Sequence, residues 1–372
     1  IIIFFFFITL FSYGQWMPEG LTTSPELNVA DSARITVKGN ILGFFKNDEY
    51  VSPLTKGKTL PGVRFEPSVG YQIGTSVRAD VILNAIYYSG DVLEHGDKFV
   101  GSVDVRLQYS PKSTPDLHLI LGNYYGGMNH RLIEPMYAWE RHLNDDSESG
   151  FQVLYKNENL FLDTWVNWKQ YIEYGDSVPE VLTFGLSSSL KLPSMKDGRL
   201  RFNIPLQLMV YHEGGQIDVS DSKMVVAGNL ATGICSEYSL GDGTLKNIGF
   251  NLYALGYYDK RPDPNKRPYD KGWALYPTLQ FDMSPLKASL GYWHSQKYFS
   301  FMGESLFNSF NIYDPKQQLP TRDLLVAKLF YSSQIDKRFT WGAHLETYTE
   351  LNDKFKTNYS FGVYMRMNTR LF

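Results

Sequence analysis

The sequence has almost no cysteine, no strong excess of charge and no repeated long apolar runs. Its single cysteine, Cys235, excludes an internal disulfide. The formal net charge of −3 gives no electrostatic reason to bind nucleic acid. Beyond the N-terminal block, no segment approaches the roughly 18 apolar residues that a membrane-spanning helix needs. The sequence contains no HExxH motif and no GxSxG motif, so we assign no metal, cofactor or catalytic residue from motifs.

The N-terminal block is the exception to this pattern. Residues 1–14 read IIIFFFFITLFSYG, an apolar run followed by small residues. Such a run is typical of the apolar core of a secretory signal peptide, and we interpret residues 1–14 as part of one. Residues 15–32 are polar with two prolines and are interpreted as a periplasmic lead. Residues 33–372 are then expected to form a single domain.

The last stretch, 354–372, alternates strictly between apolar and polar residues. Side chains of a strand point alternately to opposite faces, so this stretch predicts one long amphipathic strand. Its apolar face carries Phe355, Thr357, Tyr359, Phe361, Val363, Met365, Met367 and Leu371. Phe372 lies in the opposite phase, with Arg366, Asn368 and Arg370.

The same alternation recurs along the chain and predicts about 16 strands, with about 14–18 as the range, in an all-β fold. Short turns near Gly74, Pro111, Glu158 and Asp197 alternate with longer connections. This organisation, the signal-like start and the terminal Phe resemble Gram-negative outer-membrane β-barrels of the porin type. The resemblance implies a single transmembrane antiparallel up-and-down barrel in the outer membrane, with short periplasmic turns and long external loops.

The polar faces of the predicted strands carry charges of both signs. Three adjacent strands place pairs at similar positions: Arg64/Glu66, Arg78/Asp80 and Asp104/Arg106. These pairs either stiffen a water-facing wall or form a selectivity patch with a weak preference for anions. The full set of predicted pore-lining residues is Arg64, Glu66, Arg78, Asp80, Asp104, Arg106, Asp163, Lys169, Arg201 and Gln207.

The long connection 126–150 is the third external loop by this count. In general porins, which the chain resembles in length and strand number, that loop folds into the lumen and forms the constriction. The residues predicted to set the field there are Arg131, Glu134, Glu140, Arg141 and His142. A loop lying on the outer rim is the alternative, and both placements stay open. A short helix is expected over residues 134–143.

The expected function is passive diffusion of small hydrophilic solutes or ions, without enzymatic activity. The expected partners are outer-membrane lipid, lipopolysaccharide and these solutes, with a homo-oligomer left open and no nucleic acid. One alternative is a barrel subunit of a secretion, adhesion or surface-lipoprotein complex. A second is a membrane-embedded hydrolase, because His212 and His294 are expected to face outward near the external rim; spacing places no serine beside them.

Overall fold

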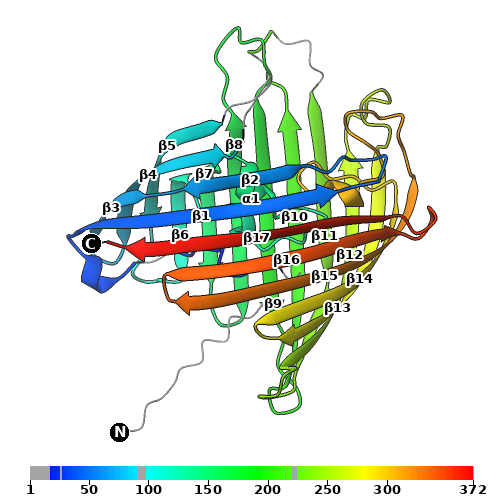
Figure 1. Cartoon of the computed structure of the whole chain (residues 1–372). Helices are drawn as coiled ribbons and strands as arrows, with labels where there is room; N and C mark the ends of the chain where they lie inside the picture. The colour runs from blue at the N-terminus through cyan, green and yellow to red at the C-terminus, as the bar shows by residue number, and fades with distance from the viewer. Residues whose placement is uncertain (1–16, 26, 91–97, 216, 220–223, 372) are drawn as a thin grey trace.

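The computed structural model is a closed β-barrel whose near and far walls cross at a steep angle (Figure 1). The structure describes residues 17–25, 27–90, 98–215, 217–219 and 224–371. The predicted signal peptide and Phe372 lie outside these residues. Within the described chain, no helix is long and apolar enough to cross a membrane.

Seventeen strand segments form one antiparallel sheet that closes when β1 pairs with β17. The strands are β1 (Ile35–Glu49), β2 (Thr59–Phe65), β3 (Ser68–Ile73), β4 (Val77–Tyr88), β5 (Phe99–Tyr109), β6 (Leu117–Asn123), β7 (Ser149–Lys156), β8 (Leu160–Gln170), β9 (Val181–Lys191), β10 (Leu200–Glu213), β11 (Val225–Ser239), β12 (Asn247–Asp259), β13 (Lys271–Met283), β14 (Leu286–Gln296), β15 (Thr321–Asp336), β16 (Phe339–Glu350) and β17 (Thr357–Arg370). The described helical segments are the 3-10 turns η1 (Val29–Asp31), η2 (Gly127–His130) and η3 (Ser305–Phe307) and the helix α1 (Arg141–Asn144).

Two of these segments share one place in the wall. Both β2 and β3 pair with β1 on one side and with β4 on the other. They are separated at Glu66 and Pro67, since proline has no N–H to give to a sheet ladder. The strand is therefore broken here, although apolar residues alternate in phase from Val63 to Ile73. Counted around the barrel there are 16 strands, which confirms the predicted architecture.

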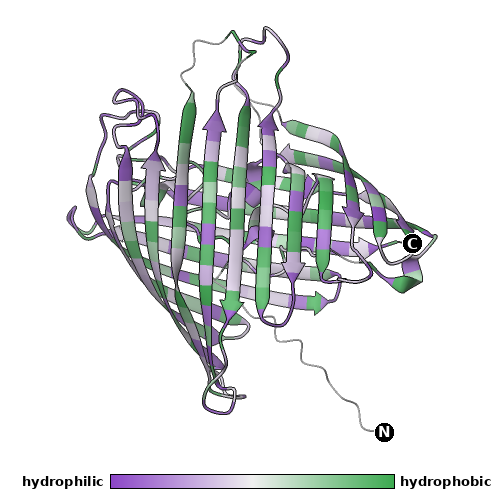
Figure 2. Ribbon diagram, turned by 180° about the vertical axis from the view of Figure 1, so that it is seen from behind, coloured by the Kyte–Doolittle hydropathy of each residue, from purple (hydrophilic) through white to green (hydrophobic). Residues whose placement is uncertain are grey.

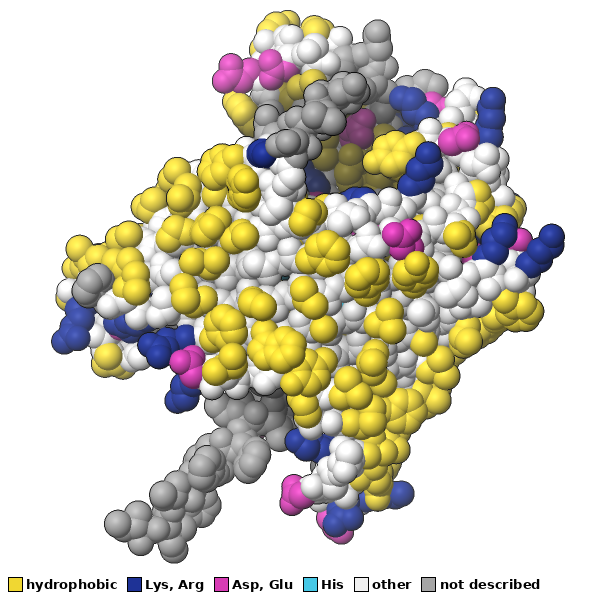
Figure 3. All heavy atoms as spheres, viewed as in Figure 1, with side chains coloured by type: hydrophobic (Ala, Val, Ile, Leu, Met, Phe, Trp, Pro, Cys, Tyr) yellow, Lys and Arg dark blue, Asp and Glu magenta, His cyan; other side chains and the backbone are white. Residues whose placement is uncertain are grey.

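The alternation along each strand sorts side chains into the two surfaces of the wall. On β17, Tyr359, Phe361, Val363 and Met365 are exposed, whereas Asn358, Ser360, Tyr364 and Arg366 are buried. Figure 2 shows the same alternation on other strands, and Figure 3 shows apolar side chains gathered in a broad band with charged side chains toward the ends. Such a band is a surface for hydrocarbon, so the barrel is of the outer-membrane type.

The wall is not equally tall all round. β5 pairs with β4 along its whole length but with β6 only from Arg106 to Tyr109. Residues 99–105 have no strand partner on that side among the described residues, and Phe99 and Val103 are exposed there. This open edge lies on the side of the short strands β6 and β7, where the chain leaves the wall to enter the lumen.

Candidate functional site: a divided lumen

The third external connection, residues 124–148 and hereafter L3, turns into the barrel. Just outside the loop, Gly122 of β6 and Gly150 of β7 face each other as a strand pair. Both have positive φ, and a Cβ on either would lie 2.1–2.2 Å from a carbonyl oxygen of the neighbouring strand. Glycine is therefore needed for the chain to leave the wall here. Of the two placements left open by the sequence, the lumen is the one observed.

A histidine anchors the first part of L3 to the wall. His130 is fully buried, with Nδ1 2.8 Å from Asp163 and Nε2 2.9 Å from Glu148. Its ring stacks on Trp165 with centroids 3.4 Å apart. Burial alone would lower the pKa of His130, but the carboxylates of Asp163 and Glu148 outweigh it and raise this pKa to about 9. The imidazolium is the stable form at neutral pH, and it bridges the loop to β8.

A second anchor ties the middle of L3 to the opposite wall. Lys328 on β15 forms ion pairs with Glu134 of L3 and Glu346 of β16, and all three are buried. The hydroxyl of Tyr348 donates to Glu134 at 2.9 Å, and the indole N–H of Trp139 donates to Glu346 at 2.9 Å. L3 is thus fixed to both sides of the barrel by buried, hydrogen-bonded charges.

The connection between β14 and β15, residues 297–320 and hereafter L7, also folds inward. It contacts L3 through backbone bonds such as Ala138 N–H to Met302 O at 2.8 Å. The guanidinium of Arg141 donates to the carbonyls of Met302 and Phe301, and the Tyr298 hydroxyl donates to the carbonyl of Pro135. The two loops therefore form one unit.

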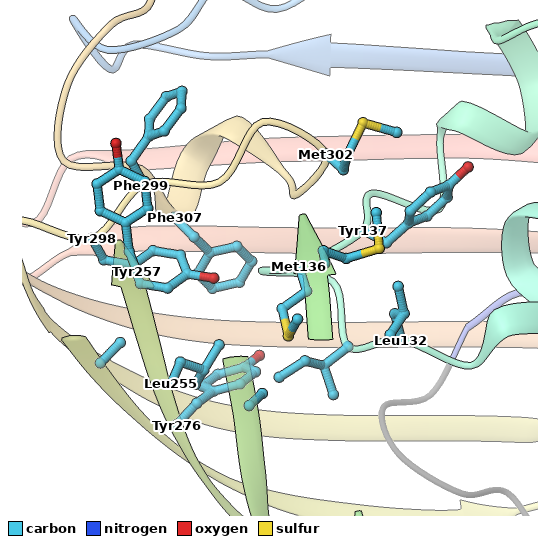
Figure 4. Packing of buried hydrophobic residues seen from close by; sticks show 14 of the residues in the cluster. Leu132, Met136, Tyr137, Leu255, Tyr257, Tyr276, Tyr298, Phe299, Met302 and Phe307 are labelled. Carbon is cyan, nitrogen blue, oxygen red and sulfur yellow. The ribbon is translucent and has the colours of Figure 1, made fainter. Parts of the chain in front are cut away.

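Aromatic and aliphatic side chains fill the lumen where this unit meets β11 to β16. Figure 4 shows Phe299 and Phe307 of L7 near Tyr257 of the wall, and Met302 of L7 on the side of Tyr137 of L3. Phe307 is fully buried and packs edge-on against Trp293. We call this region the dry half of the lumen. Its buried hydrophobic members include Met136, Tyr253, Leu255, Tyr257, Tyr276, Trp293, Tyr298, Phe299, Leu306, Phe307, Phe310 and Tyr348.

The N-terminal lead, residues 17–25, packs against the lumen side of the barrel. Leu21 is buried in a cluster with Leu42, Phe44 and Trp139. The carbonyls of residues 20 and 22 accept from the guanidinium of Arg366 on β17. The lead therefore belongs to the packed interior.

The other half of the lumen holds a polar cavity of about 760 Å³, hereafter the chamber. Its wall is formed by β1, β17 and β2 to β8, its floor partly by the lead, and its inner side by L3. The charged residues that line it are Asp31, Lys38, Arg64, Glu66, Arg78, Asp80, Arg106, Asp116, Arg131, Arg141, Asp146, Glu148, Lys156, Asp163, Arg366 and Arg370. Tyr124, Tyr125, Tyr137 and Phe161 supply aromatic surface.

The first six predicted pore-lining residues lie at or beside this chamber. Arg64 pairs with Glu66, and Arg78 pairs with Asp80, each within its own strand rather than across strands. The third pair, Asp104 and Arg106, does not form. Instead, Asp104 accepts from the side chains of Asn84, Asn123 and Ser147, and Arg106 donates to the carbonyl and side-chain oxygens of Asn123.

The other four predicted residues are spread around the barrel. Asp163 lines the chamber and holds His130, and Gln207 fixes L3 by accepting from Ile133 N–H and donating to Arg131 O. Lys169 lies 3.7 Å from Asp145 of L3. Arg201 pairs with Glu237 on the neighbouring strand. Whether solutes pass any of these residues stays a prediction.

The five predicted constriction residues all lie on the inward loop. The Arg131 guanidinium lies 4.2 Å from the ring centroid of Phe161, and Glu140 pairs with Lys46 and Lys58. Burial and the neighbouring charge of Arg64 lower the pKa of His142 to about 4. The helix expected over residues 134–143 is wrong in extent, because only Arg141–Asn144 is helical and tertiary contacts hold the rest.

The outer surface carries a second group of polar residues near the external ends of β14 and β15. His294 Nδ1 lies 2.7 Å from Asp323 Oδ1, and the same carboxylate accepts from Tyr292 and Asn352. Tyr292 is exposed on the outer face. His212, the other rim histidine, donates to the carbonyl of Gly214. His294 is thus oriented by a carboxylate, whereas His212 is not.

Sequence reasoning missed the inward fold of L7 and the packing of the N-terminal lead. A signal for L7 was present, because Tyr298, Phe299, Phe301, Phe307 and Phe310 give that connection an aromatic content unusual for a water-exposed loop. No comparable signal marks the lead, in which Pro18 and Leu21 are buried and Met17 packs beside them.

Fold and site together define a class, the outer-membrane β-barrel whose lumen is divided by inward-folded loops. Within that class, residues 27–372 match the family model described as lipid A 3′-O-deacylase-type, and the chain belongs to that family. No curated protein matches the chain in sequence.

Solved structures share the fold at low sequence identity. OccAB2 of Acinetobacter baumannii has a TM-score of 0.54 at 11% identity, over 93% of this chain and 100% of that one. A BenF-like porin from Pseudomonas fluorescens Pf-5 has a TM-score of 0.53 at 8% identity, over 92% and 100%. Pseudomonas aeruginosa OccK2 (OpdF), solved in complex with glucuronate, has a TM-score of 0.52 at 9% identity, over 91% and 98%. These likenesses establish the fold.

Proposed function

We propose that the protein is an outer-membrane channel that passes small hydrophilic solutes through the chamber side of the lumen. The observation that carries this proposal is the chamber itself, a charged cavity of about 760 Å³ beside a lumen half that is filled with apolar side chains. Because L3, L7 and the lead narrow the lumen, the channel is selective rather than a general-diffusion pore. The likeness in fold to a BenF-like porin supports a channel.

Conductance in planar bilayers tests the channel. The unmodified protein is expected to give small, discrete openings. A variant in which residues 129–147 of L3 are replaced by a short Gly-Ser linker is expected to give openings several-fold larger, because the loop no longer narrows the lumen. A double variant, Lys328→Met with Glu134→Gln, releases one anchor while keeping the loop. Absence of openings from correctly folded unmodified protein and from both variants contradicts the proposal.

A second candidate is hydrolysis of an ester in an outer-leaflet lipid. The family match and the His294–Asp323 pair at the external rim favour it. Asp323 accepts from Nδ1–H, which leaves Nε2 of His294 as the base. Nε2 takes a proton from water while the water oxygen attacks the ester carbonyl. The same proton then passes to the leaving alkoxide, giving a carboxylic acid and an alcohol.

Acyl release from purified lipid A, followed by mass spectrometry, tests this second candidate. His294→Gln is expected to abolish the release, whereas His212→Gln, at the matched rim position, is expected to leave it unchanged. Equal release by both variants, or none from the unmodified protein, contradicts a catalytic role for His294.

A further inference from the structure

The charges that line the chamber do not cancel. Its lining contains nine Lys and Arg against seven Asp and Glu, so cations remain once the ion pairs are made. Asp31, Glu66 and Asp80 each form an ion pair with an arginine. Glu148 and Asp163 both pair with the buried His130. Arg141 is also paired, with Asp145, and the carboxylate of Asp104 lies beside the lining, so the excess of positive charge is small.

Arg106 is the cation best placed to use this surplus. Among the described residues, no carboxylate lies within ion-pair distance of its guanidinium, whose partners are the two oxygens of Asn123. Its plane rests on the ring of Tyr125, 4.1 Å from the centroid. The group is only partly buried, so it is held in position while part of it stays accessible from the chamber.

An arginine held in this way matches the oxygens of a carboxylate or phosphate, because a planar guanidinium can donate two parallel hydrogen bonds. A second guanidinium, that of Arg131, rests on Phe161 in the same lining, near Lys156 at the end that carries the short turns. Positive groups thus occur at the mouth of the chamber and further inside.

We propose that the chamber binds small acidic solutes, of the size of a sugar acid or a sugar phosphate, with Arg106 contacting the anionic group. The volume agrees, since sites for small molecules typically measure about 300–1,000 Å³. The proposal names the solute class of the proposed channel and rests on that function for its role in transport.

Calorimetric titration of the detergent-solubilised barrel tests the site. Glucuronate and glucose have the same ring size and differ in the charged carboxylate, so glucuronate is expected to bind and glucose is not. Arg106→Gln is expected to weaken glucuronate binding at least about tenfold, the effect of losing a charge-assisted hydrogen bond. Arg106→Lys keeps the charge and is expected to retain part of the affinity for glucuronate. The matched control, Arg338→Gln, removes an exposed cation in the turn between β15 and β16 and is expected to change nothing.

A competition with inorganic phosphate separates the two anion chemistries. Displacement of glucuronate by phosphate assigns the site to both anions, and retention assigns it to carboxylates. Equal binding of glucose and glucuronate, or unchanged binding by a folded Arg106→Gln variant, overturns the inference. Binding in detergent does not require conduction, so a barrel that binds glucuronate but never opens in a bilayer contradicts the channel and leaves the site standing.

Discussion

The two halves of the lumen are built from the same kind of strand but carry different inward side chains. In the dry half, L7 presents Phe299, Phe307 and Phe310 to the inner faces of β12 to β16, where the charged side chains of Arg322 and Glu350 are buried as an ion pair. In the chamber, strands of the same alternating pattern present arginine, aspartate and asparagine to a cavity. The difference lies in the inward residues, because the outward faces are apolar on both sides.

The two halves are therefore expected to differ in what they contribute, stability in one and solute binding in the other. Apolar burial in the dry half holds L7 in place and adds to the buried ion pairs that fix L3, since close packing makes loss of any member costly. The charged groups of the chamber are expected to contribute less to stability, and under our proposal they select the solute. Substitutions in the dry half should therefore act mainly on stability, and those in the chamber mainly on binding.

The largest effect is expected from Phe307→Ala in the dry half. The ring is fully buried among Trp293, Tyr276 and Tyr348, and its removal leaves a cavity that costs about 3–5 kcal/mol. The free energy of unfolding, from urea titration in detergent, measures the change. A loss below about 1 kcal/mol shows that L7 does not pack tightly and contradicts the division of the lumen.

His130, where L3 meets the chamber wall, is expected to make a smaller and pH-dependent contribution to the free energy of unfolding. Its pKa of about 9 lies above the ordinary value near 6.5, so the folded state binds the proton more tightly than the unfolded state. This stabilisation is complete below about pH 6.5 and is lost as the pH rises through about 9. Unfolding titrations between pH 6 and pH 10 follow the loss. His130→Gln should flatten this pH dependence, and an equally steep profile in that variant would assign it to other groups.

Trp139→Phe tests a single hydrogen bond between L3 and the wall. The indole N–H that donates to Glu346 is lost while most of the ring volume stays, so the expected cost is about 1–2 kcal/mol. The same urea titration measures it, and bilayer recordings should show a noisier channel because one tether of L3 is gone. An unchanged free energy of unfolding and unchanged current noise would mean that this hydrogen bond does not hold L3 in place.

The smallest effect is expected from Arg201→Gln, outside both halves of the comparison. Arg201 pairs with Glu237 near the short-turn end of β10 and β11, where both side chains are partly exposed. Exposed pairs of this kind contribute about 0–1 kcal/mol. Glucuronate binding should match that of the unmodified protein. A marked loss of binding would extend the anion site beyond the chamber.

The sequence carries most of the information about the wall. Strict alternation in segments such as Thr357–Arg370 follows from the period of a strand, and it predicts both the strand and the face that meets lipid. It also places Arg64, Arg78 and Arg106 on the inner face, where they are observed. The break at Pro67 was missed, since alternation continues in phase on both sides of it.

The interior could be predicted only in part, because its partners come from distant positions. Glu134 meets Lys328, and His130 meets Asp163, through the fold of L3 and not through any local pattern. Arg78 pairs with Asp80, two residues further along the same strand, whereas Asp104 and Arg106 do not pair. Side chains at positions i and i+2 of a strand share a face, so the sequence left both pairings open.

The open edge of β5 has a consequence for the exchange of backbone hydrogens. Amides of residues 99–105 that do not bond to β4 have no strand partner on their other side among the described residues. Such amides exchange with solvent unless another group accepts from them. In heavy water, this segment should take up deuterium far sooner than the doubly paired strands β11 and β12. Residues 99–105 are thus the strand segment expected to exchange first, beside the position where L3 enters the lumen.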